Sequence, residues 1–125
     1  MLTRSQQYAQ AAFPAVQRHF PQATKELSKE QKEYRTFAKK FPALIHTCGL
    51  AQAIAFAQAK GHDDYLSDLA AVISRAGHPE ITSAESLGQH SRTDPLNLYM
   101  QLSRDAIHAA GWLKRYVEAL AGEEE

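Results

Sequence analysis

The chain has 125 residues, of which 44% are hydrophobic and 22% are charged. That length predicts a single domain spanning residues 1–125, and the composition is that of an ordinary globular protein, outside the disordered range. One cysteine cannot form an internal disulfide, and Met1–Gln10 lacks the apolar core of a secretion signal. We therefore expect a cytoplasmic protein, and a small disulfide-stapled secreted fold is excluded.

The charges sum to zero, with 14 Lys and Arg against 14 Asp and Glu, but they are unevenly distributed along the chain. Residues 1–62 carry nine basic and three acidic side chains, a balance of +6, so residues 63–125 sum to −6. This asymmetry has two interpretations. It gives either a basic face suited to a phosphate backbone or an acidic neighbour, or two halves that attract each other on folding.

Apolar residues recur at spacings of three and four almost throughout, which predicts an all-helical fold. Thr3 is the expected N-cap of a first helix that ends near Phe20, and Pro14 should kink or split it. Ser28 and Gln31 fit a capping box at the start of an amphipathic second helix. The apolar side of that helix carries Tyr34, Phe37 and Phe41.

Residues 41–59 contain no charge, so a membrane span has to be considered. The polar side chains and alanines of this stretch argue against a span and favour a central core helix, with Pro42 in its first turn and Gly61 after its end. We expect Cys48 to be a buried, inert thiol. The alanines expected to pack tightly against neighbouring helices are Ala51, Ala53, Ala55, Ala57 and Ala59.

A fourth helix should start at Asp63 or Asp64 and stop at Gly77. A short helical turn after Ser83 and an exposed loop over residues 88–93 follow. Asp94 and Pro95, as N-cap and first helical residue, should open a long last helix that ends at Gly122, before a solvated acidic tail at 123–125. The prediction is an all-α, single compact bundle of five to six helices with a long C-terminal helix.

The sequence carries no recognisable catalytic or metal-binding motif. His46 and Cys48 lie two residues apart, about 200° around a helix, and so cannot share one ion. His90, Ser91 and Asp94 are the residue types of a nucleophilic triad, but in one loop their side chains should diverge. We expect no cofactor, no metal and no small-molecule substrate. A metal-independent ribonuclease built from two histidines stays open.

Two segments carry a family resemblance. The first reads Phe-Pro-Ala-Leu-Ile-His-Thr-Cys-Gly-Leu-Ala-Gln-Ala-Ile-Ala-Phe over 41–56 and is closed by Lys60-Gly61; the second is Trp-Leu-Lys-Arg-Tyr over 112–116, with Glu118-Ala119. Together they resemble the small all-helical subunit of the type III-B CRISPR RAMP-module (Cmr) effector complex. The resemblance marks a structural core motif of Pro42, Leu44, Ile45, Gly49, Leu50, Phe56, Gly61 and Trp112.

The resemblance implies a non-catalytic subunit in antiviral defence. Copies of the subunit would stack into an inner filament beside the backbone subunits that hold the guide RNA, and they would line the groove for target RNA. We also expect no membrane partner, because the composition of residues 41–59 favours a core helix over a span. The cations expected to contact RNA phosphates are Lys39, Lys40, Lys60, Lys114 and Arg115. A helix of about 18 residues is roughly 27 Å long, so Lys40 and Lys60 at its two ends should not reach the same phosphate.

Two other functions remain alternatives to this subunit role. A free-standing ribonuclease would turn over RNA alone and lose activity on changing one or two histidines. A helical adaptor without a nucleic-acid role would use its +6 half to meet only acidic protein.

Overall fold

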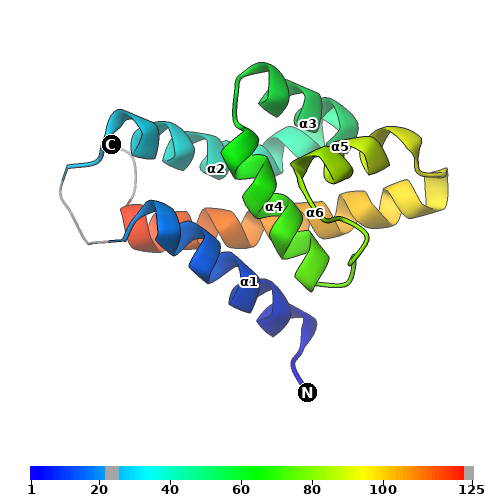
Figure 1. Cartoon of the computed structure of the whole chain (residues 1–125), viewed down its shortest axis with the longest axis horizontal. Helices are drawn as coiled ribbons and strands as arrows, with labels where there is room; N and C mark the ends of the chain where they lie inside the picture. Colours follow the sequence, from blue (N-terminus) through cyan, green and yellow to red (C-terminus); the bar gives the residue numbers. More distant parts are fainter. Residues whose placement is uncertain (22–25, 123–125) are drawn as a thin grey trace.

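The computed structural model describes residues 1–21 and 26–122, and within these ranges the chain forms helices and no strand. The helices are α1 Arg4–His19, α2 Lys29–Cys48, α3 Leu50–Ala59, α4 Asp63–Arg75, α5 Ala84–Thr93 and α6 Leu96–Ala121. The predicted all-α bundle with a long C-terminal helix is thus confirmed. Helix α6 runs the length of the molecule and packs mainly on α2 and α1 (Figure 1). The predicted acidic tail lies outside the described residues.

The first two helices start where the capping residues predict. Thr3 and Ser28 each accept a hydrogen bond from the backbone amide three residues later, with Gln6 and Gln31 completing the two capping boxes. Of the two effects expected of Pro14, a kink or a split, the split does not occur, because α1 continues through this residue. Pro14 is exposed, so the carbonyl that it leaves without a helical donor is positioned to meet water.

The expected single helix over 41–59 is two helices. Helix α2 passes through Pro42 and ends at Cys48, and α3 begins at Leu50. Between them Gly49 adopts φ +86°, a conformation that side-chain-bearing residues rarely adopt. The hydroxyl of Tyr99 accepts a hydrogen bond from the amide of Ala51 at 3.1 Å and so satisfies one of the free donors at the start of α3.

The break at Gly49 changes which residues of this segment are buried. Ala53 and Ala57 are fully buried, whereas Ala55 and Ala59 are exposed, so the expectation of an alanine face packed throughout is wrong. Cys48 is exposed as well, because it ends α2 instead of lying in the middle of a core helix. In the proposed core motif Ile45 and Leu50 are buried, Gly61 is exposed, and the others are half-buried: Pro42, Leu44, Gly49, Phe56 and Trp112.

The expected loop over 88–93 is the second half of α5. Ser83 caps this helix by accepting from the amide of Ser86, and Leu87 enters the core. Gly88 allows close packing on α3, since a Cβ there would lie 3.2 Å from the Gln58 amide nitrogen. Asp94, expected to cap α6, ends α5 instead.

Two buried carboxylates connect α1 to the rest of the bundle. Asp68 of α4 is 2% exposed. Its carboxylate is hydrogen-bonded to the side chains of Arg18, of His19 at 2.9 Å and of Tyr34 at 2.6 Å, and these contacts join α1, α2 and α4. Asp105 of α6 is paired with His78 at 2.7 Å and with Arg4 at 3.3 Å. Each carboxylate therefore has hydrogen-bonding partners that offset the cost of its burial.

Candidate functional site

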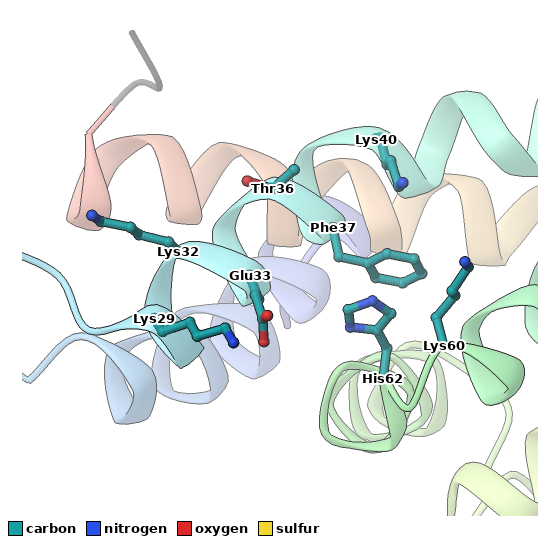
Figure 2. A pocket seen from close by; sticks show the side chains of 8 residues that line it. All are labelled: Lys29, Lys32, Glu33, Thr36, Phe37, Lys40, Lys60 and His62. Atoms are coloured by element: carbon teal, nitrogen blue, oxygen red, sulfur yellow. The ribbon is translucent and has the colours of Figure 1, made fainter.

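A basic cleft of about 530 Å³ lies between α2 and the turn that joins α3 to α4. We call it the lysine cleft (Figure 2); its lining residues are Lys29, Lys32, Glu33, Thr36, Phe37, Lys40, Lys60 and His62. Four ammonium groups and one carboxylate give it a positive balance. Such a concentration of charge attracts anions and raises their local concentration.

Aromatic rings form the floor of the lysine cleft. The imidazole of His62 stacks on Phe37, with ring centroids 3.8 Å apart and planes 14° from parallel (Figure 2). The Lys40 ammonium lies 5.7 Å from the centre of Phe37 and 5.4 Å from that of Phe56, and Lys60 lies 5.8 Å from Phe56. Cation–π contacts of this kind contribute about 0.5–1 kcal/mol at exposed sites, so they favour these positions of the ammonium groups.

The four lysines of the cleft form no ion pair with any residue of the described ranges. Since each ammonium carries three donors and no acceptor, these groups are available for an external anion. A phosphate oxygen is a suitable acceptor, and lysine binds it as a point charge.

The break at Gly49 brings Lys40 and Lys60 together. Both ammonium groups lie over the same ring, Phe56, because α3 does not continue the axis of α2. The expectation that these two lysines sit at opposite ends of one long helix is therefore wrong. Lys39 does not line the cleft; it is half-buried and lies about 100° around α2 from Lys40.

Lys29 and Lys32 line the lysine cleft, although sequence reasoning did not place them among the RNA contacts. A signal was present: Lys29, Lys32, Thr36 and Lys40 follow at steps of three and four, which places them on one helix face. Lys60 could not be added to that face from spacing alone, since its position depends on the turn at Gly49.

Lys114 and Arg115 lie on a different part of the surface, along α6. They line a hollow of about 560 Å³ together with Pro42, Ile107, Gly111 and Glu118. A neighbouring hollow of about 290 Å³ is lined by Ile107, His108, Gly111, Trp112 and Arg115. The structure thus separates the five predicted cations: Lys40 and Lys60 share one cleft, and the pair on α6 borders others.

Two histidines do meet in one hollow of about 330 Å³, as a two-histidine ribonuclease would require. His78 and His90 line it, with Glu80 and Asp94 among their neighbours. Both ring nitrogens of His78 face carboxylates, Nε2 at 2.7 Å from Asp105 and Nδ1 at 3.3 Å from Glu80. This leaves His78 no free nitrogen for a substrate, and the acidic lining disfavours a phosphate.

The side chains of His90, Ser91 and Asp94 do not form a catalytic triad. His90 Nδ1 lies 2.9 Å from the carboxylate of Asp94, but the hydroxyl of Ser91 donates to the carbonyl of Gly88 at 2.6 Å. A nucleophile must instead be hydrogen-bonded to its base.

Across residues 1–21 and 26–122, no cluster of three or more His, Cys, Asp or Glu is arranged to hold a metal ion. In the same ranges, no helix is long and apolar enough to cross a bilayer.

The chain matches known proteins over nearly its whole length. The family model described as CRISPR-associated protein (Cas_Cmr5) matches residues 4–120. A Thermus thermophilus protein named CRISPR system Cmr subunit Cmr5 is 36% identical over 126 residues, covering 98% of this chain and 100% of the relative.

The fold matches as well. The crystal structure of a CRISPR-associated Cmr5 family protein, also from Thermus thermophilus, aligns with a TM-score of 0.81 and 33% identity, covering 95% of this chain and 98% of the other. Sequence and fold agree along the same residues, and the chain therefore belongs to the Cas_Cmr5 family of CRISPR-associated proteins.

Proposed function

We propose that this protein is a small, non-catalytic subunit of a type III-B CRISPR Cmr complex and lines the groove where target RNA pairs with guide RNA. The name of the Thermus thermophilus relative supports the membership of the complex. The lysine cleft supports the contact with RNA, and it is the single observation that carries this part of the proposal.

The lysine cleft suits a phosphate backbone more than it suits a base sequence. Its polar groups are mainly ammonium donors, which bind phosphate oxygens and read no base edge. In an RNA-guided complex, base pairing with the guide already specifies the sequence, so the protein needs only to follow the strand. Lys40 and Lys60 form the centre of the proposed contact, with Lys29 and Lys32 extending it along α2.

Lys39, Lys114 and Arg115 remain RNA-contact candidates outside the cleft. Pro42 of α2 borders the same hollow as Lys114 and Arg115, so a strand leaving the cleft over Lys39 would reach α6 at that point. We expect these residues to contribute further phosphate contacts along that path.

The remaining partners are the backbone subunits and further copies of this chain. Charge supports head-to-tail stacking, because residues 1–62 sum to +6 and residues 63–125 to −6. Heterologous contacts of this kind generate open filaments when the rotation does not close. The proposed inner filament therefore requires no symmetric dimer.

The test is RNA binding by the Lys40→Glu, Lys60→Glu double variant, measured by fluorescence anisotropy at several salt concentrations. Each single-stranded phosphate contact contributes about 0.7 to the slope of log affinity against log salt. We expect the double variant to bind unrelated RNA sequences more weakly, all to the same extent. The slope of log affinity against log salt should become flatter by about 0.7 per lost contact. The control is Arg104→Glu, which reverses an exposed cation on α6 that lines none of these hollows.

The same variants belong in a reconstituted complex. If the double variant assembles and the complex keeps its full target affinity and salt slope, the cleft is not the RNA contact.

Mass spectrometry of the proteins that co-purify with the native chain separates the three functions. A guide-containing complex supports the proposal, and acidic proteins alone support an adaptor. RNA turnover by the purified chain, lost in His78→Ala or His90→Ala, supports a ribonuclease.

A further inference from the structure

The glycine in the middle of α6 has no role in the packing of this chain. A Cβ built at Gly111 meets no atom of residues 1–21 or 26–122 within 4 Å, and the residue does not adopt a positive φ. A glycine inside a helix costs about 0.8–1.0 kcal/mol relative to alanine. The bundle would accept alanine at position 111, so the glycine serves neither a close helix contact nor a turn.

The space that Gly111 leaves is on the surface of α6. Two hollows meet there and share Ile107, Gly111 and Arg115 in their linings. The smaller hollow, of about 290 Å³, also has Trp112 and His108 in its wall. We call it the Gly111 hollow. Its size is near the lower end of the roughly 300–1,000 Å³ of small-molecule sites, which favours a single planar fragment over a whole nucleotide.

The lining of the Gly111 hollow combines aromatic surface with unpaired positive charge. The indole of Trp112 is half-buried and packs against Tyr116, with ring centroids 5.8 Å apart, so its position is constrained. Arg115 is exposed and, like Lys114 beside it, forms no ion pair with any described residue. Proteins that bind single-stranded nucleic acid use this combination, in which aromatic side chains stack on bases and cations follow the backbone.

We propose that the Gly111 hollow binds one unpaired base of single-stranded RNA, stacked on Trp112, with the guanidinium of Arg115 on the adjoining phosphate. The absence of a side chain at Gly111 lets the base approach the helix. This site rests on the proposed RNA-binding function for its ligand, but it uses none of the residues of the lysine cleft. An acidic protein segment would pair with Arg115 and Lys114 yet leave the apolar surface of Ile107 and Trp112 uncovered.

Trp112 provides the readout, because it is the only tryptophan of the chain. A base stacked on an indole quenches its fluorescence, whereas a phosphate at Arg115 alone does not bring an aromatic ring into contact. We expect a short single-stranded oligoribonucleotide to quench the emission in a saturable way. A ribose-phosphate oligomer of the same length without bases should bind through the cations and leave the emission unchanged, as should an acidic peptide.

The matched variants are Gly111→Leu and Gly111→Ala. Neither should lower the melting temperature, since the position is open, but the leucine side chain fills the hollow. We expect Gly111→Leu to abolish the quenching and to weaken RNA binding roughly five- to hundred-fold, the range of one lost base stack. Gly111→Ala should have a smaller effect. Arg115→Ala should weaken binding, whereas Arg104→Ala on the same helix should not.

Anisotropy measured on the same samples distinguishes the two proposals. RNA that binds without quenching, or quenching that Gly111→Leu leaves intact, overturns the base site and leaves the lysine cleft standing. Equal quenching by the acidic peptide assigns the hollow to a protein partner and also overturns the base site. If no RNA binds in low salt, both the base site and the proposed function fail.

Discussion

The hydroxyl of Tyr34 in α2 donates a hydrogen bond of 2.6 Å to the carboxylate of Asp68 in α4. Both side chains are buried, and the Asp68 carboxylate is also hydrogen-bonded to the side chains of Arg18 and His19 in α1. The carboxylate is thus the point at which three helices meet. The hydroxyl of Tyr65, one turn before Asp68 on α4, is buried with no hydrogen-bond partner in the part of the chain that the structure describes.

This pair of tyrosines predicts opposite effects for the same substitution. Tyr34→Phe should lower the free energy of unfolding by about 1–3 kcal/mol, because a buried carboxylate loses a donor. Tyr65→Phe should leave it unchanged or raise it, since no hydrogen bond is lost and an unsatisfied hydroxyl is removed. Urea denaturation of the two variants measures both effects. Equal losses in both would show that the Asp68 contact contributes nothing specific.

Alkaline pH should destabilise the fold through the same residues. Burial raises the pKa of Tyr34 and of Tyr65, and the negative charge of Asp68 raises both pKa values further. Burial, followed by the charge of Asp105, also raises the pKa of Tyr8. Because unfolded tyrosines ionise near pH 10, the unfolded chain releases these protons first, and stability present below about pH 10 is lost above it.

The slope of the free energy of unfolding against pH gives the number of tyrosines that titrate. Each such tyrosine should lower the free energy of unfolding by up to about 1.4 kcal/mol per pH unit above its unfolded pKa. Urea titrations between about pH 8 and about pH 11 measure this slope. The Tyr34→Phe, Tyr65→Phe double variant should have a flatter slope than the parent. An unchanged slope would show that other groups titrate.

Most of the fold could be predicted because helix periodicity and capping are local signals. Thr3 and Ser28 cap their helices through residues three positions later, and the acidic pair Asp63 and Asp64 marks the first turn of α4. The break at Gly49 could not be predicted in this way, because an uncharged run from α2 into α3 has the same pattern whether or not its axis turns. The position of Lys60 beside Lys40 depends on that turn, and so the part of the lysine cleft formed by Lys60 and His62 could not be predicted from spacing.

Substitutions at Gly49 and in α3 test the turn between α2 and α3. Gly49→Ala should destabilise the protein by about 1–3 kcal/mol, because φ +86° with ψ 160° is a conformation essentially restricted to glycine. Ala57→Phe should destabilise it by overpacking, by about 1–3 kcal/mol or more, since Ala57 is fully buried. Ala55 is exposed, so Ala55→Phe should not overpack the core and should lie within about 0.5 kcal/mol of the parent. Thermal melts compare the three.

Cys48 should react in the folded protein. Its side chain is exposed at the end of α2, and it is the only cysteine, so a maleimide should label the native chain once without denaturant. Intact mass spectrometry measures the extent of labelling, and Cys48→Ser serves as the blank. Labelling that requires urea would place the thiol in the core and contradict the helix break beside it.

Helix α6 covers α1 and α2, yet it comes last in the chain (Figure 1). A ribosome that adds about 5–20 residues per second needs about 2 to 6 seconds to synthesise residues 96–125. During that time the faces of α1 and α2 that pack on α6 have no partner, although α3 and α4 can already contact these helices, so the nascent chain must hold an uncovered surface. Premature termination before α6 would release a chain that exposes this surface to aggregation. We therefore expect completion of the last helix to commit each new molecule to its folded form.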